Sequence, residues 1–202
     1  MTARKFLTMR EVEGLIEVVQ DGMTGPRDCC LILLAFRHGF RISELLNLNF
    51  RDLDLDEGRI YIRRLKNGLS TIHPLMKDEL QALRKWKEER VAWKADSEPE
   101  RVFISRRGSR LSRQQAWRII SRAGEKAGTV IGTYPHMLRH ACGYELAERG
   151  TDTRLIQDYL GHRNIRHTVR YTAGNAARFA GIWDKENILD RNNNFQDVQK
   201  TD

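Results

Sequence analysis

The sequence predicts a single domain that is mainly α-helical and carries a small antiparallel β-sheet, an α+β fold. Apolar residues recur at helical spacing along most of the 202-residue chain, whereas residues 52–75 alternate apolar and polar positions as strands do. No internal repeat, low-complexity tract or proline-rich linker divides the chain. Its length suits one substantial core. We therefore expect one domain over residues 1–190 and a polar, disordered tail over residues 191–202.

Three helices are expected before the sheet. A capping-box pattern that begins at Thr8 starts a first amphipathic helix. Pro26 marks the start of a second, very apolar helix that ends near Gly39. A short third helix is expected within residues 40–46, with Arg41 at its start and its leucines toward the core.

The sheet is predicted from the alternation in residues 52–64 and 70–75. A Lys66-Asn67-Gly68 turn lies between these two segments. We expect antiparallel strands, with Lys66 at the tip of the hairpin that joins them.

The rest of the chain is expected to be helical. The pattern predicts a charged helix over residues 77–94, and residues 102–104 could add a short strand. Ser112 caps a helix that runs to Gly128, and Pro135 begins the next helix. Further helices are predicted over residues 153–160, 165–172 and 175–183.

Composition excludes a membrane protein, because no apolar run approaches the roughly 20 residues that span a bilayer. The N-terminus lacks the apolar stretch of an export signal. We therefore expect a protein with no membrane partner, located in the cytoplasm. The odd number of cysteines (Cys29, Cys30 and Cys142) predicts reduced thiols rather than a disulfide framework.

Positive charge is concentrated in one segment. The chain has a net charge of +8, and residues 101–122, here called the arginine-rich segment, hold seven arginines and no acidic residue. Arginine binds phosphate oxygens in a bidentate manner, so this segment predicts a polyanionic partner, namely a nucleic acid. A solvated basic surface that binds nothing specific is the alternative. The candidate DNA-binding residues are Arg106, Arg107, Arg110, Arg113 and Arg118.

His136, Arg139 and His140 are spaced to share one helix face. Two histidines four residues apart can bind zinc, but the zinc-protease motif requires a glutamate after the first histidine, and Met137 stands there. We expect no metal. The remaining interpretations are a structural histidine pair, or a histidine and an arginine that face a phosphate.

Breaking a phosphodiester without a metal requires cations for the phosphate oxygens, a nucleophile, and an acid for the leaving oxygen. Arg41 and Arg139 can bind the phosphate oxygens, and His162 can donate a further hydrogen bond there. Tyr171 can attack, with His136 as proton acceptor, and we expect cationic neighbours to favour the Tyr171 phenolate.

Lys66 can protonate the leaving hydroxyl from the hairpin tip. Each of these six residues on its own has a plainer interpretation as a surface charge, a turn, a helix terminus or a packing residue. Their presence together, in this order, is what predicts an active site.

The set resembles the signature of the tyrosine site-specific recombinases, over about residues 8 to 185. The matching features are Arg41 within RISELL, Lys66 in a β-hairpin, HMLRH at residues 136–140, Leu160-Gly161-His162, and Tyr171. The resemblance implies the fold of that family's catalytic domain and a 3′-phosphotyrosine intermediate at Tyr171, with release of a 5′-hydroxyl. It implies neither ATP nor any other cofactor, since the phosphotyrosine conserves the bond energy. It also implies supporting roles for His140 and Glu44.

Within the family, the segments CLILLAFRHGFRISELL and DTRLIQDYLGHRNIRHTVRYT are similar to the fimbrial phase-switch recombinases. That likeness implies inversion of a promoter-bearing segment of double-stranded DNA between inverted repeats, by a homo-tetramer in the synapse. It also implies a bacterial cytoplasmic protein associated with the nucleoid. The N-terminal core-binding domain of most family members is not expected here. The segment from Ala173 to Trp183 could dock on a neighbouring protomer or fold back on its own core.

Three alternatives stay open at this point. A type IB topoisomerase would use nearly the same chemistry on one duplex. A recombinase could carry out integration or excision instead of inversion. A non-catalytic DNA-binding transcriptional regulator would need the arginine-rich segment but would have no use for Lys66 and Tyr171.

Overall fold

The computed structural model describes residues 4, 6–65, 68–93 and 97–179. In chain order the elements are α1 (Met9–Gln20), α2 (Gly25–Arg37), α3 (Ile42–Leu45), η1 (Phe50–Asp52), β1 (Leu53–Asp54), β2 (Arg59–Ile62), β3 (Thr71–Pro74), α4 (Lys77–Arg90), η2 (Val91–Trp93), α5 (Arg113–Lys126), α6 (Pro135–Glu148), α7 (Thr153–Leu160), α8 (Arg166–Thr172) and η3 (Ala176–Phe179). The predicted α+β class, mainly helical with a small antiparallel sheet, is confirmed.

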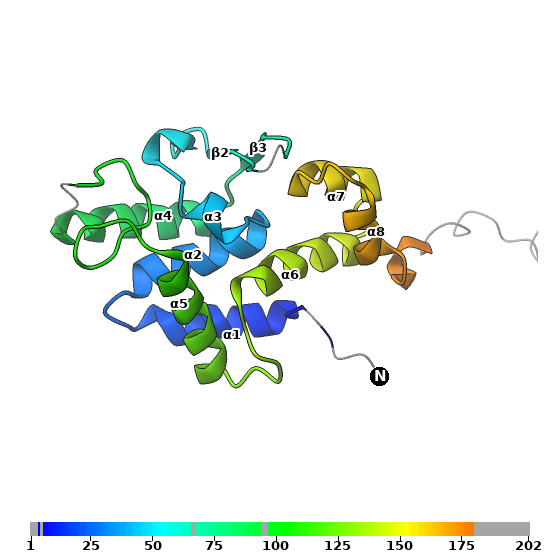
Figure 1. The fold of residues 1–202 in the computed structure, drawn as a ribbon, viewed down its shortest axis with the longest axis horizontal. Coiled ribbons are helices and arrows are strands. Elements are labelled where there is room, and N and C mark those ends of the chain that lie inside the picture. The colour runs from blue at the N-terminus through cyan, green and yellow to red at the C-terminus, as the bar shows by residue number, and fades with distance from the viewer. Residues whose placement is uncertain (1–3, 5, 66–67, 94–96, 180–202) are drawn as a thin grey trace, which may run out of the picture.

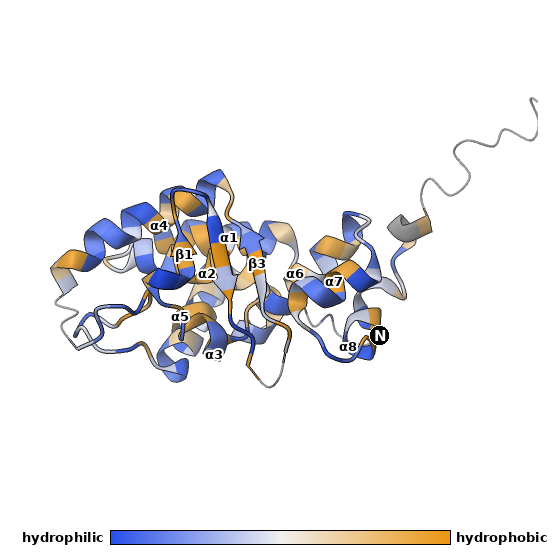
Figure 2. Ribbon diagram, turned by 90° about the horizontal axis from the view of Figure 1, so that it is seen from above, coloured by the Kyte–Doolittle hydropathy of each residue, from blue (hydrophilic) through white to orange (hydrophobic). Residues whose placement is uncertain are grey.

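Helix α2 forms the centre of the fold. It packs against α1, α4 and α6, and most of its side chains are buried. In Figure 1 the sheet lies above α2 and α4, whereas α1 and α5 lie below them. Helices α7 and α8 lie at one end of the molecule, and the C-terminal part of α4 lies at the other end in both views (Figures 1 and 2).

The helix boundaries follow the capping signals in the sequence. Thr8 and Ser112 each make the predicted capping box, and Pro26 and Pro135 lie in the first turns of α2 and α6. These side chains and ring constraints satisfy or remove backbone N–H groups that a helix leaves unpaired at its start. Most helices carry both hydrophilic and hydrophobic residues, as Figure 2 shows.

The sheet is antiparallel with the order β1-β2-β3. Ile60 pairs with His73 and Tyr61 with Ile72, so that Ile60 and His73 face the core whereas Tyr61 and Ile72 face outward. This alternation is what the sequence pattern predicted. The hairpin tip at Lys66 lies outside the described residues.

Two predictions on the elements differ from the structure. Residues 102–104 do not form a strand, although all three are fully buried; the isolated bridges here involve Arg101, which precedes them, and Ile104, the last of the three. Loop partners satisfy this backbone, since Val102 N–H donates to Leu48 and the Trp86 indole donates to the Val102 carbonyl. The last helix is a short 3-10 turn within the described residues, and residues 180–183 and the tail lie outside them.

No helix in the described part of the chain is long and apolar enough to cross a bilayer.

Candidate active site

Two histidine-bearing helices, α6 and α8, meet the start of α3 at one small pocket of about 160 Å³. The residues that line it are Arg41, His136, Arg139, His140, His162, His167, Arg170 and Tyr171. Five of the six predicted catalytic residues therefore come together, although they are spread over most of the chain. Lys66, the sixth, lies outside the described residues.

Tyr171 projects from α8 into a close-fitting space against α6. Its side chain is buried, with 3% of the residue exposed. The ring lies directly over Gly143, where an added Cβ would come within 2.6 Å of the ring, and packs edge-on against Tyr144. The Tyr171 hydroxyl lies 3.0 Å from Nδ1 of His140.

The surroundings of Tyr171 differ from the prediction in two ways. Burial raises the pKa of Tyr171 to about 12, and the opposing charges of Arg139 and Arg170 do not overcome it. The cationic surroundings therefore do not give a phenolate in the DNA-free protein. The hydrogen-bond neighbour of the hydroxyl is His140 rather than His136, whose ring instead packs edge-on against His140.

Three histidines of the pocket, His136, His140 and His162, are neutral at physiological pH. Burial first, and nearby charged groups second, lower the pKa of His140 to about 4 and of His162 to about 3; the pKa of His136 is lowered in the same way. A neutral His140 can accept the hydroxyl proton through Nδ1. Nδ1 of His162 lies 2.9 Å from the hydroxyl of buried Thr168, which leaves Nε2 for a ligand in the pocket.

Arg41 is oriented by Glu44, for which the resemblance implies a supporting role. Oε1 of Glu44 accepts from the Arg41 guanidinium at 2.6 Å, and Oε2 accepts from the Arg41 backbone N–H at 3.0 Å. Burial alone would raise the pKa of Glu44, but Arg64 and Arg41 hold it below its ordinary value. Because Glu44 occupies only part of the guanidinium, the remaining Arg41 donors stay available to a phosphate.

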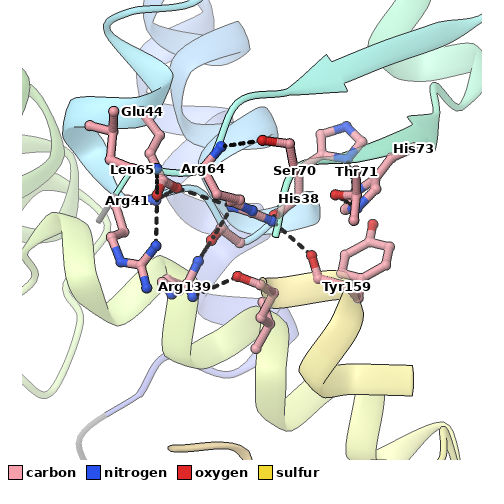
Figure 3. A network of polar contacts seen from close by, with 12 residues as sticks. His38, Arg41, Glu44, Arg64, Leu65, Ser70, Thr71, His73, Arg139 and Tyr159 are labelled. Atoms are coloured by element: carbon pink, nitrogen blue, oxygen red, sulfur yellow. Dashed lines mark hydrogen bonds and ion pairs between the residues drawn. The ribbon is translucent and has the colours of Figure 1, made fainter. Parts of the chain in front are cut away.

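Arg139 is almost completely buried, with 1% of the residue exposed. It donates to the carbonyl of Gly39 and, at 2.8 Å, to the carbonyl of Leu160. Burial and the neighbouring arginines lower its pKa to about 10, so it stays charged at neutral pH. One side chain of α6 thus holds the turn after α2 and the end of α7 around the pocket (Figure 3).

His167 and Arg170 line the pocket but were not singled out in the sequence. Both are exposed residues of α8, the helix that carries Tyr171. The available signal was their position within the run of basic residues before Tyr171. A linear sequence does not say which of those side chains turn toward the pocket.

The arginine-rich segment does not form one surface. Arg106, Arg107 and Arg118 line a separate groove of about 740 Å³ together with Arg122, whereas Arg110 and Arg113 are not among its lining residues. Arg110 donates to the side chain of Asn47, just after α3, and Arg113 is the first residue of α5. DNA contact by these five residues stays a prediction.

Within the described residues, no group of three or more histidine, cysteine, aspartate or glutamate side chains is placed to hold a metal ion.

The model of the Phage integrase family matches residues 5–178, which is most of the chain. The chain belongs to the phage integrase family. As a phage integrase family member of the tyrosine recombinase type, it is an enzyme that cleaves and rejoins DNA strands.

Two curated relatives narrow the position of the chain within the phage integrase family. It is 67% identical to the type 1 fimbriae regulatory protein FimE of Escherichia coli strain K12, over 94% of this chain and 96% of that protein. It is 55% identical to the type 1 fimbriae regulatory protein FimB of the same strain, over 90% of each. The resemblance to the fimbrial phase-switch recombinases is therefore confirmed.

The fold of the chain is similar to the crystal structure of the XerA recombinase, with a TM-score of 0.75 and 28% identity. The match covers 88% of this chain and 63% of the XerA chain, so the chain spans slightly less than two thirds of that structure.

Proposed function

We propose that this recombinase inverts a DNA segment between inverted repeats through a 3′-phosphotyrosine at Tyr171, and thereby controls fimbrial phase variation. The 67% identity to a type 1 fimbriae regulatory protein supports the fimbrial role. The observation that carries the chemistry is the Tyr171 hydroxyl, 3.0 Å from a neutral histidine in a pocket that Arg41 and Arg139 also line.

In the proposed cleavage step the Tyr171 oxygen attacks the scissile phosphorus, and the bond from phosphorus to the 5′-oxygen breaks. The phenol proton passes to Nδ1 of His140, and Lys66 donates a proton to the departing 5′-oxygen. His136 supports His140 through their ring contact. Rejoining runs the same steps in reverse from a 5′-hydroxyl, so neither ATP nor a cofactor is required.

The charge that develops on the phosphate oxygens is stabilised by two cations and one neutral histidine that are already in place. Arg41 has part of its guanidinium held by Glu44, Arg139 is fixed by two carbonyls, and His162 offers Nε2. Arg170, which also lines the pocket, adds a further positive charge. Such preorganised groups contribute most of the stabilisation in reactions of this kind, because they do not have to reorganise as charge builds.

Contact with the surrounding DNA is proposed for Arg106, Arg107, Arg110, Arg113 and Arg118. Residues 1–190 act as one catalytic domain in this proposal. Four copies assemble on two duplexes in the synapse, with the segment from Ala173 to Trp183 docked on a neighbour, in the bacterial cytoplasm.

The test is covalent trapping on a suicide duplex that carries the repeat and a nick beside the cleavage point. The native protein should form an adduct, and Tyr171→Phe should bind the duplex without forming one. Tyr61→Phe, which removes a hydroxyl from the outer face of the sheet, is the matched control and should form the adduct normally. An adduct with Tyr171→Phe would exclude Tyr171 as the nucleophile.

A plasmid assay then separates inversion from the alternatives. With the presumed promoter segment between inverted repeats, the native protein should reverse its orientation. Adduct formation without inversion, or with excision only, would contradict the proposed outcome while leaving the chemistry intact. Repeat binding with no adduct from the native protein would indicate a non-catalytic regulator.

A further inference from the structure

Arg64 is a buried arginine that does not line the pocket but contacts the segments that form it. It follows β2, and its side chain is 0% exposed. A buried guanidinium is costly unless its donors are satisfied, so its partners indicate why the fold retains it.

Arg64 donates to four acceptors from three parts of the chain. These are Oε2 of Glu44 at 3.1 Å, the carbonyls of His38 and Gly39 at 3.1 and 3.4 Å, and the carbonyl of Tyr159 at 2.7 Å. Figure 3 shows the Arg64 side chain between Glu44 and Tyr159, with Arg41 on the side of Glu44 and Arg139 below it.

The acceptors of Arg64 are also the acceptors of the pocket arginines, or their direct neighbours. Glu44 accepts from both Arg64 and Arg41, and the Gly39 carbonyl accepts from both Arg64 and Arg139. Tyr159, which accepts from Arg64, directly precedes Leu160, which accepts from Arg139. A movement of Arg64 would therefore shift the acceptors that position both Arg41 and Arg139.

The stem of Arg64 is confined between two glycines. An added Cβ at Gly68 or at Gly161 would lie 2.8 Å from Arg64 side-chain carbons. The guanidinium also lies over the ring of Phe40, 5.6 Å from its centroid. Because the side chain is held along its whole length, its end is positioned accurately.

The negative charge of Glu44 is a second reason for a buried arginine at position 64. Glu44 is buried and ionised, and Arg41 and Arg64 are the cations that the described part of the chain pairs with it. If Arg64 were absent, Glu44 would neutralise the positive charge of Arg41. With Arg64 present, the buried pair is neutral and the charge of Arg41 is left for a phosphate.

We infer that Arg64 is a positioning residue for the phosphate site: it neutralises Glu44 and fixes the carbonyls of Gly39 and Tyr159, so that Arg41 and Arg139 face the scissile phosphate. This inference rests on the proposed function. Lysine cannot replace it, since one ammonium group cannot reach acceptors on three segments at once.

The test compares Arg64→Lys with Arg90→Lys. Arg90 is also a buried arginine that donates to two carbonyls, of Glu98 and Pro99, and lies over the ring of Phe50, but it is in α4 and does not line the pocket. Single-turnover cleavage is measured at saturating DNA concentration and at a temperature below the thermal unfolding midpoint of every variant. Each protein is given the suicide duplex with a normal scissile phosphate or with a methylphosphonate there.

A methylphosphonate lacks one charged oxygen, so its cleavage depends less on correctly placed arginines. We expect Arg64→Lys to slow cleavage of the phosphate about tenfold or more, in the range seen when one electrostatic interaction is removed, with DNA affinity unchanged. The reduction should be clearly smaller on the methylphosphonate. Arg90→Lys should change the two rates by the same factor.

An unaltered rate for Arg64→Lys, or an equal reduction on both substrates, would overturn the inference. If the wild-type protein forms no adduct, the proposed function itself fails. If the wild-type protein forms the adduct and Arg64→Lys cleaves at the wild-type rate, only the role of Arg64 is rejected. Should Arg64→Lys not fold, Glu44→Gln with Arg64→Met removes the buried charges as a pair. That double variant should cleave the phosphate more slowly than Glu44→Gln alone, and an equal rate would count against Arg64.

Discussion

At Gly143, the ring of Tyr171 occupies the space that any side chain would need. Three ring atoms would lie 2.6–2.7 Å from an added Cβ, closer than real contacts of this kind. Gly143→Ala should therefore displace the ring and lower the free energy of unfolding by about 1–3 kcal/mol, as overpacking does. It should also reduce adduct formation, measured on the suicide duplex beside a denaturation curve.

Gly132→Ala is the control for Gly143→Ala, because a Cβ at Gly132 would meet no heavy atom within 4 Å. A Gly143→Ala protein with full stability and normal adduct yield would show that the ring is not held as described.

His162 makes the stability of the protein depend on pH. Its pKa is lowered to about 3, chiefly by burial, whereas an unfolded histidine titrates near about 6.5. Between these values the unfolded state binds more protons, so the free energy of unfolding should fall as the pH falls, by up to about 1.4 kcal/mol per pH unit for one proton. His162→Asn should flatten this slope in urea titrations from pH 6.5 to 4. An unchanged slope would contradict a neutral, buried His162.

The residues that the sequence predicted at the site are those whose types carry chemistry in a recognisable order, such as Arg41, Arg139 and Tyr171. Arg64 was missed because its importance depends on carbonyls from distant segments, which no local pattern records. The preference of Tyr171 for His140 over His136 was missed for a related reason. Both histidines lie on the same helix face, and only the packing of α8 decides between them.

At the scale of elements, most helix limits were predictable because caps are local. The Thr8 and Ser112 boxes and the two prolines fix helix starts by interactions within a few residues. Residues 102–104 were not predictable in the same way. Their apolar pattern correctly indicated burial, but a strand also requires a paired neighbour along its length, and here a loop and Trp86 take that place.

The contact between α5 and the segment before α6 should be sensitive to one methyl group. An added Cβ at Gly124 would lie 2.5 Å from Cβ of Thr133, and the Thr133 carbonyl is held by Ser121 at 2.7 Å. Gly124→Ala gains about 1 kcal/mol of helix propensity but should be destabilised by about 1–3 kcal/mol through the clash, so the net effect should be a less stable protein.

In a Thr133→Gly background the two severe contacts disappear, only the Thr129 hydroxyl remains close, at 3.1 Å, and the gain in helix propensity remains. Gly124→Ala should then raise the free energy of unfolding, which chemical denaturation of the four proteins of this cycle would show. The same sign in both backgrounds would mean that α5 and Thr133 are not in this contact.

For the whole molecule, the sequence correctly indicated one strongly basic chain but could not divide its charge between surfaces. The seven arginines of residues 101–122 are continuous in sequence, yet a turn and a helix direct them differently, and only some line the groove beside α5. A basic sequence predicts a polyanionic partner; the geometry decides which arginines can contact one phosphate backbone together.

That division predicts how DNA binding responds to salt. If the groove follows the DNA backbone, replacing Arg106, Arg107 and Arg118 together by glutamine should weaken binding, because fewer counterions are released when fewer phosphates are neutralised. The slope of log K against log salt should become shallower by about 0.9 for each phosphate that is no longer neutralised, measured by fluorescence anisotropy on a duplex with the repeat. The control replaces Lys77, Lys85 and Lys87, three exposed residues of α4, by glutamine, which makes the same change in net charge. Equal slopes for the two triple variants would mean that net charge alone attracts DNA, whereas a shallower slope for the arginine variant alone would locate the DNA backbone in the groove.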